Sequence, residues 1–277
     1  MAKAGGKAER RKEQQAKQRQ VEVTKLQEER RRRAVKYGGG VLAVIALVVA
    51  VAAGVSLQGK AAGPSTAVAA GLGPQTNNIP SGTGQFHSGA QVLHIGNKPE
   101  LLFIGAQYCP FCAAERWAIV KSLDQFGHWS GLTSSTNTQG ESGFGLIPTF
   151  DLLHANYSSK YVGFDSKDVE DRDFKPLQKL SPAETEVFNR YDSSGGIPLV
   201  VAGGYSMTGA GYSPGVIDGK SFKAVQSSLQ SGSHTSYVAD INSESNMITA
   251  LLCHAGRNRP AAVCGRGPIQ RLVRRLK

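Results

Sequence analysis

A pair of cysteines, Cys109 and Cys112, stands between a short apolar run and a stretch with helical spacing. The run 101–106 holds no charge and is compatible with a central strand that is buried on both faces. Pro110 suits the first turn of a helix. Apolar residues then recur every three or four positions, at Ala113, Trp117, Val120 and Leu123. The sequence therefore predicts a strand, a CxxC motif and a helix in direct succession.

The position of this cysteine pair favours thiol–disulfide exchange. At the start of a helix, unpaired backbone N–H groups and the positive end of the helix dipole favour thiolate over thiol. Cys109 is therefore the expected nucleophile, exposed at the helix start. Cys112, one turn further in, could then attack the mixed disulfide and release the product. A purely structural Cys109–Cys112 bridge is the alternative, but it would close almost no loop and stabilise little.

A zinc site is the other use for a CxxC motif, and it would need further ligands. The remaining cysteines are Cys253 and Cys264, with ten residues between them, whereas structural zinc sites space each cysteine pair by two to four residues. The six histidines form no close ligand pair. We therefore expect no metal site and no other cofactor.

Patterns in the rest of the body predict a mixture of strands and helices. Strands are expected at 146–153 and 160–164, and at 198–201 and 205–207, where a Gly-Gly turn makes a hairpin. A helix opens with Ser181 at the N-cap, Pro182 at N1 and Glu184 at N3. Two more helices are expected at 220–230 and 238–252, the second leading into Cys253.

The N-terminal part contains a 20-residue stretch without charge, residues 38–57. As a helix it would be about 30 Å long, which matches the hydrocarbon core of a bilayer. A buried core helix and a cleaved signal peptide are the alternatives, but a charged region of 36 residues before a signal peptide would be far too long. Arg30–Arg33 and Lys36 directly precede the span, so the positive-inside rule keeps the N-terminus in the cytoplasm.

Charge is distributed unevenly along the chain, whose net charge is +11. Residues 1–36 hold 13 Lys and Arg against 5 acids, and residues 257–277 hold 7 against none, whereas the body is mildly acidic. A nucleic-acid-binding domain would carry its positive charge on the folded body, so we expect no nucleic-acid partner. The head is expected to be a solvated segment drawn to anionic lipid.

These patterns divide the chain into five parts. We expect a basic cytoplasmic head (1–37), a transmembrane helix (38–57), a flexible linker rich in Gly, Ala, Ser and Pro (58–85), an extracytoplasmic domain (86–256) and a basic tail (257–277). The end of the tail is expected to be solvated. The chain would then be a single-pass protein of the cell membrane.

The order of strand, CPFC, helix and a later Ile197-Pro198 entering a hairpin resembles the thioredoxin superfamily. Within it, the chain resembles an uncharacterised family of membrane-anchored extracytoplasmic thioredoxin-like proteins. The resemblance implies an α/β thioredoxin-like fold with a cis proline facing the CxxC motif. It implies that Cys109 attacks, that Cys112 resolves, and that Ile197 and Pro198 pair with an extended substrate backbone. Tyr108 and Phe111, which flank Cys109, are the other expected substrate-binding residues.

Two features depart from thioredoxin itself. The run 101–106 lacks the buried acid found there, so a carboxylate proton relay is not expected from this strand. The 89 positions from Cys109 to Pro198 exceed the minimal spacing, so residues 127–189 are expected to hold an insertion between the CxxC helix and the cis-proline strand.

The expected function is a membrane-anchored thiol–disulfide oxidoreductase that acts on protein cysteines or disulfides, with a membrane redox partner as a further expected contact. The alternative is a thioredoxin-fold binding module or scaffold without redox turnover. Phe111 offers no charge to tune Cys109, so oxidase, isomerase and reductase all remain open. Cys253 and Cys264 are expected to form a second, structural disulfide, and a second redox pair is the alternative.

Overall fold

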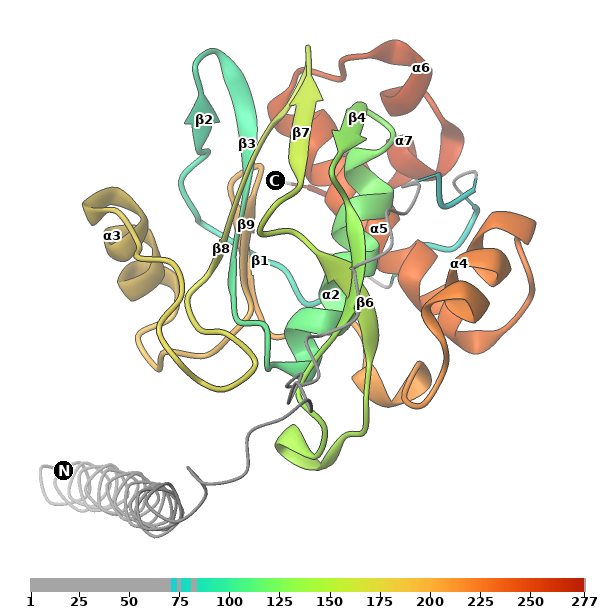
Figure 1. The fold of residues 1–277 in the computed structure, drawn as a ribbon. Coiled ribbons are helices and arrows are strands. Elements are labelled where there is room, and N and C mark those ends of the chain that lie inside the picture. Colours follow the sequence, from blue (N-terminus) through green and yellow to red (C-terminus); the bar gives the residue numbers. More distant parts are fainter. Residues whose placement is uncertain (1–70, 74–75, 81–83, 277) are drawn as a thin grey trace, which may run out of the picture. The chain divides into compact units, whose positions relative to one another are not determined.

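The computed structural model describes residues 71–73, 76–80 and 84–276. The expected head and transmembrane helix, 1–37 and 38–57, lie outside these residues. Within the described part of the chain, no helix has both the length and the apolar character needed to cross a membrane. The described residues form a mixed α/β unit with a sheet and helices (Figure 1).

The main sheet has six strands arranged around β3 (Lys98–Gly105). β3 pairs in parallel with β8 (Gly163–Asp168) and antiparallel with β9 (Leu199–Ala202), and β9 pairs antiparallel with β10 (Tyr205–Thr208). Two short strands complete the sheet, β1 (His87–Ser88) beside β10 and β2 (His94–Ile95) beside the start of β3. The apolar run 101–106 thus lies largely within the central strand, as the sequence predicts.

β3 is central because its side chains are buried on both faces of the sheet. Leu101 and Phe103 belong to the larger core, on the face covered by α2 (Pro110–Leu123). Leu102 and Ile104 belong to a smaller core on the opposite face. A strand without polar positions is stable only between two layers, because neither face then meets water.

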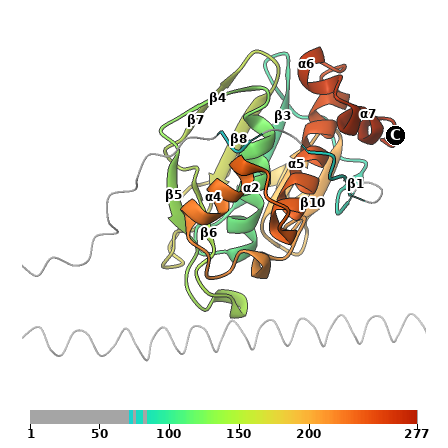
Figure 2. The same cartoon turned by 90° about the vertical axis from the view of Figure 1, so that its right-hand side faces the viewer.

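Helices supply those two layers (Figures 1 and 2). α2 and α5 (Ser236–Ala255) pack together on one face, and α3 (Pro182–Tyr191) covers the other. α4 (Phe222–Ser231) lies beside α5. Two short 3-10 helices, η1 (Glu141–Gly143) and η2 (Pro214–Val216), lie in loops.

Local signals in the sequence explain where several of these elements begin and turn. Ser181 Oγ accepts a hydrogen bond from Glu184 N, and Glu184 Oε2 accepts one from Ser181 N, which confirms the predicted N-terminus of α3. Gly203 and Gly204 form the predicted turn between β9 and β10, with φ of 58° and 87°. A Cβ at Gly203 would lie 2.3 Å from Leu251 O, so this turn needs glycine for space as well.

The region between α2 and β8 contains four short strands in two antiparallel pairs, one nested within the other along the chain. β4 (Gly127–Ser130) pairs with β7 (Asn156–Ser159), and β5 (Thr133–Thr136) pairs with β6 (Pro148–Asp151). The sequence predicted a strand at 146–153, of which only β6 is present, and it missed the others because their residues are mostly polar. The expected insertion at 127–189 is also too long, since β8 and α3 belong to the main layers.

The C-terminal residues fold onto the domain. After α5 the chain forms α6 (Ala261–Cys264) and α7 (Gly267–Val273), and α7 packs against α5. Ile269 and Leu272 are fully buried. The expectation of a solvated end was therefore wrong, because these two apolar residues at helical spacing give the basic segment a buried face.

Part of the expected linker also contacts the domain. Leu72 is buried, and Lys121 Nζ donates to Leu72 O (2.5 Å) and Gly73 O (3.0 Å). Asn246 Nδ2 donates to the carbonyl oxygens of Thr76 (2.9 Å) and Asn78 (2.6 Å). The expectation of a flexible tether is therefore wrong for residues 71–73 and 76–80, because their carbonyl groups accept hydrogen bonds from two buried polar side chains.

Two buried carboxyl groups, those of Glu115 on α2 and Glu244 on α5, both lie next to the Gly211 backbone. Gly211 N donates to Glu115 Oε2 (3.0 Å), and Glu244 packs against the Gly211 Cα. The Oε1 atoms of both glutamates have no hydrogen-bond partner within the described residues. Burial raises the pKa of Glu244 to about 7, and burial together with the Glu244 charge raises the pKa of Glu115 well above its ordinary value.

The raised pKa values make stability depend on pH. Because the folded state holds these protons more tightly than the unfolded state, we expect the free energy of unfolding to fall as pH rises from about 4.5 through about 7. Glu244→Gln should flatten this dependence and raise stability at neutral pH. Urea unfolding between about pH 5 and about pH 8 measures both effects. Glu186→Gln, at an exposed carboxylate on α3, is the control; an equal flattening there would contradict the prediction.

Candidate functional site

Cys109 is the N-cap residue of α2, and residues 106–108 connect it to the central strand. Its sulfur accepts a hydrogen bond from Cys112 N (3.2 Å), one of the unpaired N–H groups at the helix start. Cys109 Sγ also lies 3.7 Å from Ile197 O. The sulfur is thus held between the start of a helix and the chain that enters β9.

Both cysteines are free thiols and both are buried, Cys109 to 4% exposed and Cys112 to 0%. The expectation of an exposed Cys109 was therefore wrong. Loops that come from later in the chain cover this end of the helix, and their positions could not be read from the residues around Cys109. Gly105 leaves room for the Cys112 thiol, because a Cβ at residue 105 would lie 3.0 Å from Cys112 Sγ.

The environment drives the pKa values of the two thiols apart. Hydrogen bonding from the Cys112 thiol is the main cause that lowers the pKa of Cys109; burial opposes it, and the Cys112 N–H and the Arg116 charge support it. Burial, followed by the hydrogen bond to Cys109, raises the pKa of Cys112 well above its ordinary value. A thiolate therefore forms first at Cys109.

A buried ion pair lies beneath the cysteines. Arg116, one turn after Cys112 on α2, donates through Nη2 to Asp168 Oδ1 (2.5 Å) and to Ala106 O (3.3 Å). Its guanidinium also lies over the Phe103 ring, 5.4 Å from the centroid. Burial raises the pKa of Asp168, and the Arg116 charge acts in the opposite direction.

Sequence reasoning missed this ion pair. The central strand holds no acid, as expected, but its parallel neighbour β8 ends in Asp168, beside Gly105. An arginine among the mostly apolar residues of this helix was a usable signal, because an unpaired charge cannot be buried there. Asp168 gave no signal of burial, because Lys167 and Glu170, close to it in the sequence Lys167-Asp168-Val169-Glu170, are also charged.

The Ile197–Pro198 bond is cis, as the resemblance to thioredoxins implied, and it directly precedes β9. Pro198 is buried, Ile197 is half-buried, and Ile197 O faces Cys109. The structure thus brings together Cys109, Cys112, Ile197 and Pro198. A second cis bond, Arg259–Pro260, was not predicted.

Aromatic side chains flank the cysteines on two sides. The Tyr108 ring lies 4.3 Å from that of Phe174, which is 42% exposed. The Phe111 ring meets Phe144 edge-on at 5.6 Å. Tyr108 O also accepts a hydrogen bond from Thr138 N, which ties the insertion to the CxxC motif. Phe144 and Phe174 were not predicted, because they come from loops without a recognisable pattern.

Cys253 and Cys264 form the expected second disulfide, with their Cα atoms 5.5 Å apart. Both are buried. β9 separates this bridge from the CxxC motif: Pro198 precedes the strand on the Cys109 side, whereas Gly203 follows it and contacts Leu251, two residues before Cys253. The two cysteine pairs thus lie at opposite ends of the sheet.

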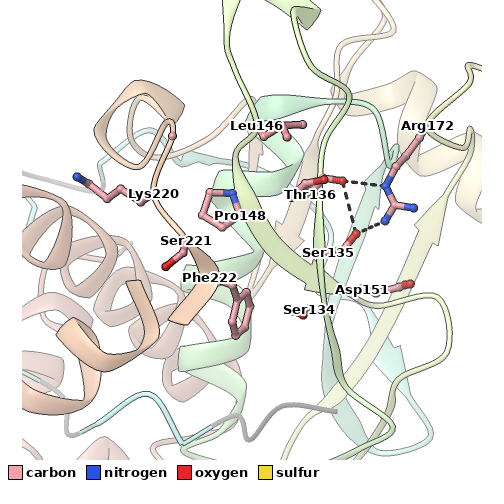
Figure 3. A pocket seen from close by; sticks show the side chains of 11 residues that line it. Ser134, Ser135, Thr136, Leu146, Pro148, Asp151, Arg172, Lys220, Ser221 and Phe222 are labelled. Carbon is pink, nitrogen blue, oxygen red and sulfur yellow. Dashed lines mark hydrogen bonds between the residues drawn. The ribbon is translucent and has the colours of Figure 1, made fainter. Parts of the chain in front are cut away.

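A hollow of about 810 Å³ lies between the β5–β6 pair and the chain that enters α4 (Figure 3). Arg172 uses its side chain to bind Thr136 O (2.9 Å) and Ser135 Oγ. Lys220 points away from Arg172, and its ammonium lies 5.1 Å from the centre of the Tyr237 ring. Because these polar groups do not converge, the hollow holds no recognisable catalytic arrangement.

Metal ligands do not gather elsewhere in the part of the chain that the structure describes. None of its His, Cys, Asp and Glu side chains form a group of three that could hold a metal ion.

Fold and site together define an α/β domain with a free cysteine pair at the start of its central helix. Residues 86–254 match a family described as a domain of unknown function, DUF929. Because the match covers more than half of the 277 residues, the chain belongs to this family. No match was found to a curated protein or to a solved structure.

The two thiols should differ strongly in reactivity. We expect iodoacetamide to alkylate Cys109 before Cys112, with a midpoint in pH below that of an ordinary thiol, because the environment of Cys109 favours the thiolate. Arg116→Met should move the midpoint upward, since a nearby positive charge is lost, whereas Arg116→Lys should restore it in part. Mass spectrometry of alkylated peptides across pH measures this. Faster labelling of Cys112 would contradict the assignment.

The disulfide should contribute to stability without taking part in exchange. Closing the loop between Cys253 and Cys264 should stabilise the domain by about 3 kcal/mol on the chain-entropy estimate. We expect a Cys253→Ser/Cys264→Ser variant to melt at a lower temperature while Cys109 keeps its alkylation profile. Calorimetry and peptide mapping test this. An unchanged melting temperature with altered Cys109 reactivity would instead indicate a redox relay.

Proposed function

We propose that this protein is a thiol–disulfide oxidoreductase with a thioredoxin-like fold, acting on protein cysteines through Cys109 and Cys112. The observation that carries the proposal is the N-cap position of Cys109, with its sulfur facing Ile197 O before the cis proline. We infer the function from Cys109 and the cis Ile197–Pro198 bond together, because a CxxC motif alone also occurs in metal sites and structural bridges.

The order and direction of the strands support the proposed fold. β3 leads into the CxxC helix, β8 returns parallel to β3, and β9 and β10 follow as an antiparallel hairpin. α2 and α5 cover one face and α3 covers the other. This arrangement places the CxxC motif and the cis proline at the same end of the sheet, as the resemblance to thioredoxins implies.

The pKa values suit the two thiols to successive steps. In the reducing direction, Cys109 thiolate attacks one sulfur of a substrate disulfide, which forms a mixed disulfide and releases the other substrate sulfur as a thiolate. Cys112 then loses its proton to that thiolate or to water and attacks Cys109 Sγ. The products are the Cys109–Cys112 disulfide and a second substrate thiol, so two electrons pass to the substrate. The oxidising direction reverses these steps.

The walls around Cys109 favour an extended substrate segment. Only 4% of Cys109 is exposed, between the loops that carry Phe144 and Phe174. A narrow opening of this kind admits a single extended chain more readily than a folded surface. Ile197 would offer its backbone to that chain, and the rings of Tyr108 and Phe111 would contact its side chains.

The proposal includes the cellular location expected from the sequence. A cytoplasmic head, a membrane span at 38–57 and a catalytic domain outside the cytoplasm place Cys109 where disulfides persist. A membrane redox partner would then restore the cysteine pair after each turnover. The proposal leaves the direction of exchange to a measurement of the reduction potential.

Trapping of mixed disulfides tests the mechanism. We expect Cys112→Ala to accumulate substrates bound to Cys109, because the resolving thiol is gone, and Cys109→Ala to accumulate none. Non-reducing gels and mass spectrometry of the full-length protein expressed in cells measure this. Trapping by neither variant, with the cysteine pair fully oxidised at every glutathione ratio, would favour the scaffold alternative. Equal trapping by both would overturn the assigned roles.

A further inference from the structure

At the end of the sheet opposite the cysteines, the protein has a hollow of about 540 Å³. Three segments line it: the turn between β2 and β3, the turn between β7 and β8, and the chain that leaves α5. In Figure 1 the β2–β3 turn lies at the upper end of the sheet, whereas α2 begins at the lower end. The hollow is therefore separate from the proposed active site.

The charged side chains that line this hollow are all cationic. They are Lys98, Lys160, Arg257 and Arg259, and the imidazole of His94 joins them. No carboxylate lines the hollow, although the body of the chain is mildly acidic. Four positive charges from three segments thus meet in one concave place, which raises the local concentration of anions.

These cations are free to bind a ligand. Lys98 Nζ uses one of its three N–H groups on Ser159 O (3.1 Å). In the described part of the chain, the side chains of Lys160, Arg257 and Arg259 make no hydrogen bond or ion pair, and all three are exposed. Arginines without a protein partner keep both arms of the guanidinium available for an oxyanion.

The backbone at Arg257 and the residue after it, Asn258, has an unusual conformation. Arg257 and Asn258 both have positive φ, 54° and 56°, a region that residues other than glycine rarely adopt. Strain of this kind persists only where the surroundings impose it, and it occurs often at ligand-binding sites. The N–H groups of Gly256, Arg257 and Asn258 bind the last carbonyl groups of α5, so the negative end of this helix is capped.

We propose that this hollow, which we name the basic hollow, binds a phosphate-bearing anion. The planar guanidinium groups of Arg257 and Arg259 match phosphate oxygens in bidentate geometry, and Lys98 and Lys160 add point charges. Tyr161, which is 39% exposed in the lining, offers an apolar face to whatever carries the phosphate. The phosphate group can belong to a free anion or to a lipid headgroup.

Titration with inorganic pyrophosphate tests the proposal. The full-length protein is held in nanodiscs of phosphatidylcholine, and calorimetry at constant ionic strength follows the binding. We expect saturable binding that weakens about tenfold or more in Arg257→Gln/Arg259→Gln, because two charge-assisted contacts are lost. Lys160→Gln, outside the strained segment, should weaken binding as well, so the test does not depend on one loop.

A matched pair of substitutions controls for total charge. Arg271→Gln/Arg274→Gln removes the same charge from the same C-terminal region, but these side chains lie outside the basic hollow. Binding should remain unchanged in this variant. Absence of saturable binding to the unmodified protein, or an equal loss in the control pair, would overturn the proposal.

Nanodiscs that also contain phosphatidylglycerol distinguish the two sources of phosphate. If a lipid headgroup occupies the basic hollow, the anionic lipid should compete and weaken pyrophosphate binding. If the natural ligand is a free anion, the affinity should be the same in both kinds of nanodisc. Either result supports the site, and neither depends on the redox chemistry of Cys109.

Discussion

Burial of the central strand on both faces is the constraint on which the rest of the structure depends. β3 has no polar side chain between Leu101 and Gly105, so helices must cover both faces of the sheet. One cover, α2, follows β3 after a short connection, which fixes the cysteines at the end of the strand. The other, α3, follows β8, whose parallel pairing brings Asp168 level with Gly105. The burial of β3 thus accounts both for the helices on the two faces of the sheet and for the position of the cysteines.

Electrostatics beneath the cysteines follow from the same layering. Arg116 is carried inward because α2 is buried around its circumference. A guanidinium in such a place requires an anionic partner, and the end of the parallel strand provides it. The pair keeps a positive charge close to two thiols whose pKa values already differ through burial and hydrogen bonding. The acid that pairs with Arg116 thus comes from the strand beside the central strand and not from the central strand itself.

The sequence predicted those parts of the fold whose signals are local. The apolar run, the helix-starting proline, the capping box at Ser181 and the Gly203-Gly204 turn each act within a few residues, and all are present. The cis proline and the pairing of Cys253 with Cys264 were also expected, the former from family resemblance.

Features that depend on distant segments could not be read in this way. The burial of Cys109, the Arg116–Asp168 pair and the short polar strands of the insertion arise from contacts between residues far apart in the chain. The folded C-terminal end was missed because its seven positive charges conceal two apolar residues, Ile269 and Leu272.

The contacts of residues 71–73 and 76–80 have a mechanical consequence. Lys121, near the C-terminal end of α2, and Asn246, within α5, hold this segment by its carbonyl groups, and Arg275 Nη1 binds Pro80 O (3.2 Å). Tension that reaches the domain through the preceding chain is therefore carried first by the helical layer. Cys109 and Cys112 lie at the other end of α2, more than two helical turns from Lys121, so the point of attachment is remote from the thiols.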